Sequence, residues 1–149
     1  TGMAAQMSAL LAILKAGDHI VAASTLYGGT IGQLGIGFSR LGIETTFVDP
    51  ADPDNFRRAI RPTTRALYGE TIGNPLVNVL DIEAVAGIAH EHGLPLVIDN
   101  TVASPYLCTP FAFGADIVVH SATKYLGGHG TTLAGNFVNM VAAGFSAAM

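Results

Sequence analysis

The chain has 149 residues, of which 50% are hydrophobic and only 12% are charged, and its net charge is −4. This length suffices for one domain with a hydrophobic core. The lack of an excess of basic residues argues against a nucleic-acid partner. No apolar run reaches the roughly 18 residues of a membrane span. The single cysteine, Cys108, cannot form an internal disulfide, which favours a cytoplasmic location.

Short apolar runs alternate with helical patterns along the whole chain. Apolar residues at intervals of three and four predict helices, and short continuous apolar or β-branched runs predict strands. In chain order, the predicted elements are a helix at 4–15, a strand at 20–23, a helix at 29–41 and strands at 44–48, 65–68, 96–98 and 117–119.

Capping residues predict two further helices between these strands. Asp52 followed by Pro53 predicts a helix with the aspartate as N-cap. Asp81 can cap a helix that continues past Ala89 and ends at Gly93. Strands and helices thus alternate, and continuous apolar strands are typical of sheets buried on both faces. We therefore expect the α/β class, with a mostly parallel sheet flanked by helices.

Polar residues follow the predicted strands. In open α/β sheets, ligands bind beyond the carboxyl ends of the strands. We therefore expect a site at this edge, formed by Tyr27, Glu70, Asn74, Asp99, Thr101, Ser121, Thr123 and Lys124.

Lys124 and Asp99 are the candidates for covalent and electrostatic chemistry. Lys124 follows a predicted buried strand, and a lysine in a partly desolvated pocket can lose its proton and form a Schiff base. Asp99 ends the preceding strand, where a carboxylate could keep the pyridine nitrogen of pyridoxal-5′-phosphate (PLP) protonated. Taken singly, the lysine is also consistent with a surface position, and the aspartate with a helix cap or a loop.

The first helix and the segment around Tyr27 are candidates for binding a phosphate and a ring. Residues 1–5 open a helix, where free N–H groups can bind phosphate, and the hydroxyls of Ser121 and Thr123 could add donors. Tyr27 precedes two glycines, so its ring could stack on a heteroaromatic cofactor. Ordinary capping and a surface turn remain the alternatives. No metal is expected, because residues 90–92 (His-Glu-His) lack ligand spacing.

In combination, these segments resemble the PLP-dependent enzymes of cysteine and methionine metabolism, which have the fold type I, aspartate aminotransferase-like architecture. The resemblance implies that residues 1–149 are a PLP-binding large domain, incomplete because an N-terminal segment and a C-terminal domain are missing. Thr1 stands where the family usually has serine. The matching segments, which follow the order of the family and cover nearly the whole chain, are residues 2–5, 26–30, 70–75, 97–101 and 115–125.

The resemblance also implies a role for each candidate. Lys124 would bind PLP and move protons between substrate carbons, Asp99 would bind the ring nitrogen, and Tyr27 would stack on the ring. Asn74 would lie near the ring hydroxyl, with Glu70 and Thr101 as further pocket residues. The phosphate would be held by Gly2, Met3, Ser121 and Thr123.

Within the family, residues 127–132 look most like O-acetylhomoserine sulfhydrylases. This implies γ-replacement on O-acetylhomoserine with sulfide or a thiol, giving homocysteine or methionine. The alternatives are a cystathionine or methionine γ-lyase or a cystathionine γ-synthase of the same family and, from another class, a catalytically incompetent truncated domain. Because the family's N-terminal segment completes the phosphate site of a neighbouring subunit, the resemblance implies a homotetramer built from dimers that share active sites.

Overall fold

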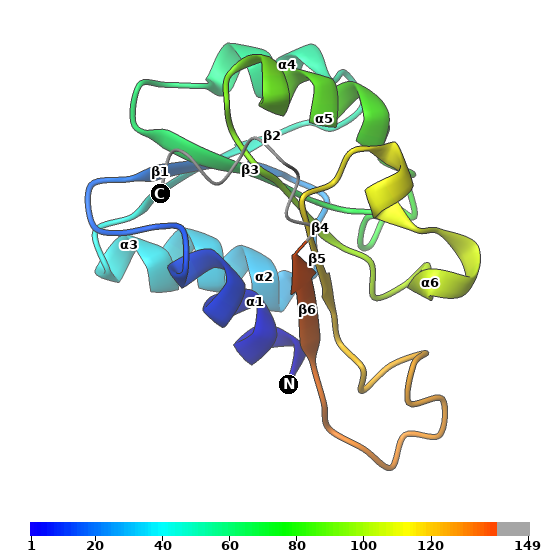
Figure 1. Ribbon diagram of the computed structural model, residues 1–149. Helices are drawn as coiled ribbons and strands as arrows, with labels where there is room; N and C mark the ends of the chain where they lie inside the picture. Colours follow the sequence, from blue (N-terminus) through cyan, green and yellow to red (C-terminus); the bar gives the residue numbers. More distant parts are fainter. Residues whose placement is uncertain (140–149) are drawn as a thin grey trace.

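The computed structural model describes residues 1–139, which form a six-stranded sheet in the order β2-β1-β3-β4-β5-β6 (Figure 1). The first five strands run parallel, and β6 is antiparallel to β5. The predicted α/β class with a mostly parallel sheet is therefore confirmed. The strands are β1 (His19–Ala23), β2 (Glu44–Val48), β3 (Thr64–Glu70), β4 (Leu96–Asp99), β5 (Ile117–His120) and β6 (Asn136–Asn139).

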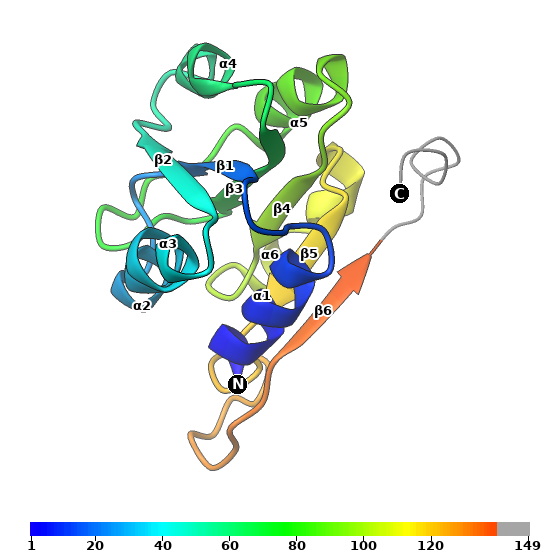
Figure 2. The same ribbon diagram turned by 90° about the vertical axis from the view of Figure 1, so that its left-hand side faces the viewer.

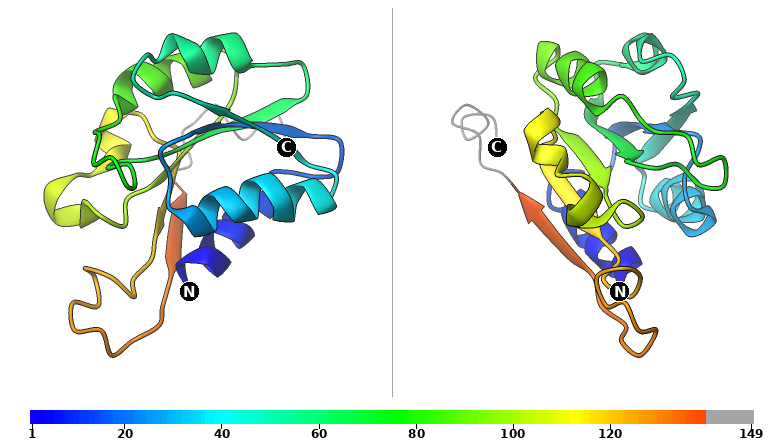
Figure 3. Two further views of the ribbon diagram at one scale, coloured as in Figure 1. Left: turned by 180° about the vertical axis from the view of Figure 1, so that it is seen from behind. Right: turned by 90° about the vertical axis from the view of Figure 1, so that its right-hand side faces the viewer.

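Helices cover both faces of the sheet (Figures 1 and 3). One layer consists of α1 (Gly2–Leu11) and a continuous helical run made of α2 (Gly28–Gly32), the π-helical turn η1 (Gln33–Gly37) and α3 (Phe38–Arg40). The other layer contains α4 (Asp54–Ala59) and α5 (Ile82–Glu91), and between β4 and β5 lie α6 (Ser104–Leu107) and the 3₁₀ helix η2 (Pro110–Phe113).

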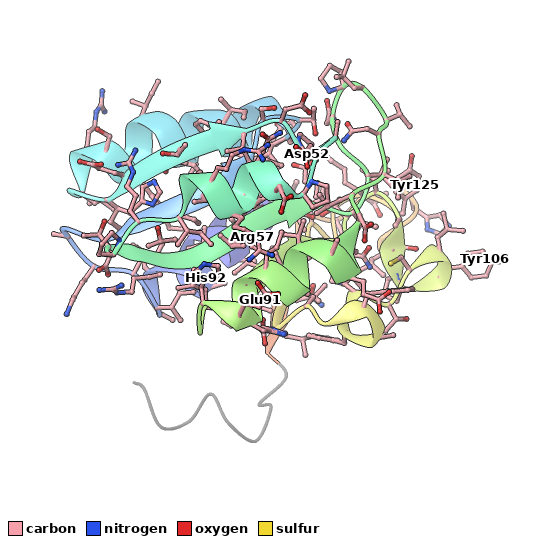
Figure 4. All side chains as sticks on the ribbon, turned by 90° about the horizontal axis from the view of Figure 1, so that it is seen from above. Asp52, Arg57, Glu91, His92, Tyr106 and Tyr125 are labelled. Carbon is pink, nitrogen blue, oxygen red and sulfur yellow. The ribbon has the colours of Figure 1, made fainter. Side chains whose placement is uncertain are left out.

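The central strands are buried because helices pack on both of their faces. Every residue of β1 and β5 is buried, whereas the edge strand β2 is only partly covered. Burying a large apolar side chain contributes roughly 1.5–3 kcal/mol, so the continuous apolar runs stabilise the sheet. Arg57 of α4 pairs with Glu91 of α5 on the outer surface (Figure 4). Within residues 1–139, no helix is long and apolar enough to cross a membrane.

Two predicted helix boundaries are wrong. The helix expected to reach residue 15 ends at Leu11, because a turn follows in which the Asp18 carboxylate accepts the Lys15 N–H at 2.9 Å. Asp52 is not the N-cap of α4, which begins at Asp54 after Pro53. The Asp52 carboxylate still accepts the Asp54 N–H at 3.0 Å, which satisfies a free N–H at the start of this helix.

The last strand was not expected from the sequence. β6 returns along β5 and lies beside α1 (Figure 2). Residues 121–135, which join β5 to β6, form a loop that projects beyond the carboxyl end of β5 (Figure 1). The start of α1 and this loop therefore meet at one edge of the sheet.

Candidate active site

A cavity of about 610 Å³ lies at the carboxyl ends of the parallel strands. β3 and β4 contribute their last residues, Glu70 and Asp99, which are register partners and so share one face of the sheet. Every candidate residue from the sequence lines this cavity. They are Gly2, Met3, Tyr27, Glu70, Asn74, Asp99, Thr101, Ser121, Thr123 and Lys124.

Backbone N–H groups at the start of α1 face the cavity without intrahelical partners. The first backbone hydrogen bond of the helix joins the Ala5 N–H to the Thr1 carbonyl at 3.0 Å, so the N–H groups of Gly2 and Met3 precede it. The Thr1 hydroxyl accepts the Ala4 N–H at 3.3 Å, which is the capping expected as the alternative reading. Capping and anion binding are compatible here, because they use different donors.

Only glycine fits at the second position of the chain. A Cβ on Gly2 would lie 2.5 Å from the Ser121 Cβ and 2.9 Å from its Oγ. A Cβ on Gly135 would likewise collide with the Thr1 carbonyl. The start of α1 is thus enclosed by both ends of the 121–135 loop, and the Ser121 hydroxyl lies beside the free N–H groups of the helix.

Asp99 is held from one side only. Its Oδ1 accepts the Thr101 N–H at 2.8 Å and the Thr101 hydroxyl at 2.5 Å. Thr101 Oγ1 in turn accepts the Ser121 N–H at 2.7 Å, which links this carboxylate to the start of the 121–135 loop. Burial raises the pKa of Asp99, and the Thr101 hydrogen bonds oppose that rise. A partly buried carboxylate whose hydrogen bonds within residues 1–139 all fall on one oxygen suits a cationic partner at the other.

Tyr27 lines the cavity from the start of α2. Its N–H donates to Glu70 Oε1 at 2.7 Å, and its ring lies against Gly29, where a Cβ would be 2.5 Å from Tyr27 Cε1. Burial raises the pKa of Glu70 to about 7, with a further contribution from Asp99, while the Tyr27 N–H lowers it. The ring is half exposed and presents an aromatic surface to the cavity.

Lys124 and Thr123 differ from the sequence-based expectation. Lys124 lines the cavity but is exposed, because the 121–135 loop projects beyond the sheet (Figure 1); the expected desolvation is therefore not provided by residues 1–139. The Thr123 hydroxyl donates to the Ala134 carbonyl at 3.1 Å and accepts the Ala134 N–H at 3.1 Å. This hydroxyl closes the loop on itself rather than standing free as a phosphate donor.

The comparisons with known proteins agree with this geometry. Residues 1–145 match the Cys/Met metabolism PLP-dependent enzyme family. The chain belongs to this family. The match confirms the resemblance inferred from the motifs, and it makes PLP the cofactor against which the cavity must be judged.

Three relatives illustrate where the chain lies within the family. It is 56% identical over 139 residues to the O-acetyl-L-homoserine sulfhydrylase of Leptospira meyeri (93% of this chain, 31% of the relative). It is 52% identical over 136 residues to the L-methionine gamma-lyase of Porphyromonas gingivalis (91% and 34%). A solved structure of a putative O-acetylhomoserine (thiol)-lyase from Campylobacter jejuni, with N′-pyridoxyl-lysine-5′-monophosphate, matches with a TM-score of 0.91 and 37% identity (93% and 34%). The chain spans about a third of the length of these proteins.

The cavity of this family member suits PLP by its donor set. Free N–H groups at the start of α1 and the adjacent Ser121 hydroxyl suit a phosphate. The one-sided hydrogen bonding of Asp99 suits a protonated ring nitrogen, and Tyr27 offers a ring surface. Lys124 lines the same cavity and supplies a primary amine. The residues present therefore fit the cofactor.

Sequence reasoning missed a buried polar network beneath these residues. Gln6 of α1 is 1% exposed, lines the cavity and accepts hydrogen bonds at Oε1 from the Tyr68 hydroxyl at 2.9 Å and the Thr30 hydroxyl at 3.2 Å. Its Nε2 donates to Gln33 Oε1 at 2.7 Å. The available signal was an amide side chain within an otherwise apolar stretch of the first helix, since such a group needs buried partners.

Proposed function

We propose that the chain is the PLP-binding large domain of a longer enzyme that replaces the γ-substituent of O-acetylhomoserine with sulfide or a thiol, giving homocysteine or methionine. The observation that carries this proposal is that four groups line one cavity. They are the N-terminus of α1, the Asp99 carboxylate with one oxygen hydrogen-bonded, the Tyr27 ring and the Lys124 amine. The 56% sequence identity between this chain and a relative named O-acetyl-L-homoserine sulfhydrylase supports the choice of substrate.

The proposal assigns one part of PLP to each part of the cavity. Bound PLP supplies an electron-withdrawing ring that stabilises negative charge on substrate carbons. Asp99 pairs with the ring nitrogen, Tyr27 stacks on the ring, and Asn74 lies near the ring hydroxyl. Thr101 keeps Asp99 oriented through its two hydrogen bonds. The phosphate is held by Gly2, Met3, Ser121 and, after a change of hydroxyl partner, Thr123, whose N–H donates to the Ala134 carbonyl at 3.2 Å.

Lys124 has two successive tasks in this proposal. Its Nζ first holds the cofactor and is displaced by the amino group of the substrate. The freed amine then accepts and returns protons at the substrate carbons between the amino group and the departing substituent. The position of Lys124 in the lining of the cavity supports both tasks.

A lyase of the same family is the second candidate function. The chain is 52% identical to an L-methionine gamma-lyase, which is close to its 56% identity to the sulfhydrylase. The full-length protein should be supplied with O-acetylhomoserine and sulfide, and both homocysteine and 2-oxobutyrate should be measured. Faster formation of homocysteine supports γ-replacement, whereas faster 2-oxobutyrate formation or efficient cleavage of methionine or cystathionine assigns the lyase function. Loss of both products in Lys124→Ala is the control.

The proposal includes partners and location. We propose a cytoplasmic location, because the single cysteine of the chain cannot form an internal disulfide. We further propose a homotetramer built from dimers that share active sites. The support is that large apolar side chains lie exposed on α6 and on two loops at the cavity, residues 71–81 and 121–135. They include Leu76, Val77, Val79, Tyr106, Leu107, Tyr125 and Leu133. If the full-length protein binds no PLP and turns over no substrate, the remaining alternative is a domain without catalytic competence.

A further inference from the structure

Glu70 is a buried carboxyl group in the cavity for which the proposed function provides no task. It ends β3, an interior strand, and only 7% of its surface is exposed. Its register partner on β4 is Asp99, so two carboxyl groups face the same cavity from adjacent strands. Asp99 is oriented by Thr101, whereas Glu70 is engaged with Tyr27.

The contact between Glu70 and Tyr27 lies at the beginning of a helix. Tyr27 is the N-cap residue of α2, and its N–H donates to Glu70 Oε1 at 2.7 Å. An acidic group at this position also interacts favourably with the positive end of the helix dipole. The hydrogen bond therefore ties the start of the 28–40 helical run to the rigid end of β3.

The Tyr27 ring depends on its own backbone for its position. The ring is 52% exposed, and within residues 1–139 its hydroxyl makes no hydrogen bond that would hold it. It rests on Gly29, whose missing Cβ leaves the space that the ring occupies. Because the ring is oriented by the backbone at residues 27–29, whatever fixes that backbone also fixes the aromatic surface facing the cavity.

We propose that Glu70 is a positioning residue that fixes the Tyr27 ring against the cofactor through its hydrogen bond to the Tyr27 N–H. The inference rests on the proposed function, in which Tyr27 stacks on PLP. Glu70 does not touch the reacting atoms in this role; it acts through Tyr27. Glutamine at this position keeps an oxygen acceptor of the same length, whereas alanine removes the acceptor.

The test is a double-mutant cycle in the full-length protein, read from PLP affinity and from the visible circular dichroism of the bound cofactor. Glu70→Ala should weaken PLP binding about tenfold, or about 1.4 kcal/mol, because the acceptor that fixes the Tyr27 backbone is lost, and it should reduce the dichroism. Glu70→Gln should retain both signals. In a Tyr27→Ala background, Glu70→Ala should have little additional effect, because the two residues act as one unit.

Two results would overturn the inference. One is an unchanged affinity and dichroism in Glu70→Ala; the other is an equal loss of affinity with and without the Tyr27 side chain, which would indicate that Glu70 acts independently of it. If Glu70→Ala does not fold, loss of the dichroism in folded Glu70→Gln would also contradict it. The proposed function is judged separately, by whether the wild-type protein binds PLP and forms homocysteine.

Discussion

Asp99 combines a partly buried carboxyl group with a hydrogen-bonding pattern that uses one oxygen. Replacing it with asparagine preserves the shape but removes the charge that, in the proposed function, would keep the ring nitrogen of PLP protonated. We expect Asp99→Asn to lower kcat by about a hundredfold or more, since a neutral ring withdraws electrons poorly. Steady-state kinetics of the full-length protein checks this, with PLP content as the control. A loss of less than about tenfold, or about 1.4 kcal/mol of barrier, would return Asp99 to a structural role.

Lys124 and Lys15 are the only lysines in the sequence, and only Lys124 lines the cavity. Lys15 follows the far end of α1, where its N–H contacts Asp18. Borohydride reduction should therefore attach the pyridoxyl group to Lys124, and Lys124→Ala should abolish the adduct while Lys15→Ala retains it. Peptide mass spectrometry of the reduced full-length protein identifies the modified lysine. An adduct on Lys15 would refute the assignment.

At the residue scale, the sequence predicts which side chains meet but not how each is hydrogen-bonded. The polar residues that follow the strands do line one cavity, because parallel strands present their carboxyl ends at one edge. The bond between Thr123 and Ala134 could not be predicted, since it depends on how the 121–135 loop closes. Gln6 was missed for a similar reason: its partners lie on α2 and β3, distant in sequence.

The Gln6 network joins α1 to β3 and to the helical run that follows Tyr27. Gln6→Leu would leave the buried hydroxyls of Tyr68 and Thr30 without this acceptor, and each unsatisfied group costs about 1–3 kcal/mol. Burial keeps Tyr68 protonated by raising its pKa well above the usual value, so it always requires an acceptor. We expect Gln6→Leu to lower the free energy of unfolding by about 2 kcal/mol and to weaken PLP binding, because the start of α1 shifts.

The control for this prediction is Tyr68→Phe. It removes a donor but leaves Gln6 bonded to Thr30, so the loss of stability should be smaller. Urea unfolding and PLP titration of both variants provide the comparison. Equal stability of Gln6→Leu and the wild-type protein would show that α1 is held by apolar packing alone.

His19 ties three strands together at the opposite end of the sheet. Its Nδ1 and Nε2 each lie 2.8 Å from a threonine hydroxyl, of Thr64 on β3 and Thr46 on β2. Burial and, to a lesser extent, Arg61 lower the pKa of His19, against a smaller opposite effect of Glu44. A base whose pKa is lowered by folding stabilises the fold above its unfolded value of 6.5, and this contribution is lost as the pH falls below that value.

The predicted consequence is a pH-dependent difference between the wild-type protein and His19→Gln. Between about pH 7.5 and about pH 5.5, the thermal midpoint of the wild-type protein should fall more than that of the variant, which has no titrating ring. Differential scanning calorimetry at both pH values measures the two slopes. Parallel slopes would mean that folding does not change the pKa of His19.

At the element scale, the strands were predicted better than the ends of the helices. Continuous apolar runs identify buried strands directly, and the observed β1, β2, β4 and β5 agree with the expected ranges to within a residue. Helix ends depend on local competition, as when the carboxylate of Asp18 captures the turn after Leu11. β6 escaped prediction because its residues, Asn136–Asn139, hold only two adjacent apolar side chains between two asparagines. Its pairing with β5 defines the strand.

The whole molecule presents its cavity and its exposed apolar residues on overlapping parts of the surface. Tyr106 is 92% exposed and Leu133 78% exposed, and Tyr106 and Tyr125 project from the same side of the molecule (Figure 4). Large contiguous apolar surfaces on soluble proteins usually mark contact sites. A charged fraction of only 12% leaves little polar surface to keep such a region soluble.

We therefore expect the 149-residue chain alone to associate or precipitate and to bind PLP weakly, whereas the full-length protein forms a defined oligomer that binds PLP tightly. Losing the burial of a few apolar side chains, at roughly 1.5–3 kcal/mol each, rivals the total stability of a typical domain, about 5–15 kcal/mol. Analytical ultracentrifugation and PLP titration of both proteins provide the test, and Tyr106→Ser with Leu107→Ser in the short chain should improve its solubility. A soluble, monomeric short chain with the PLP affinity of the full-length protein would show that these side chains do not require a partner and that one copy of the domain completes its own cofactor site.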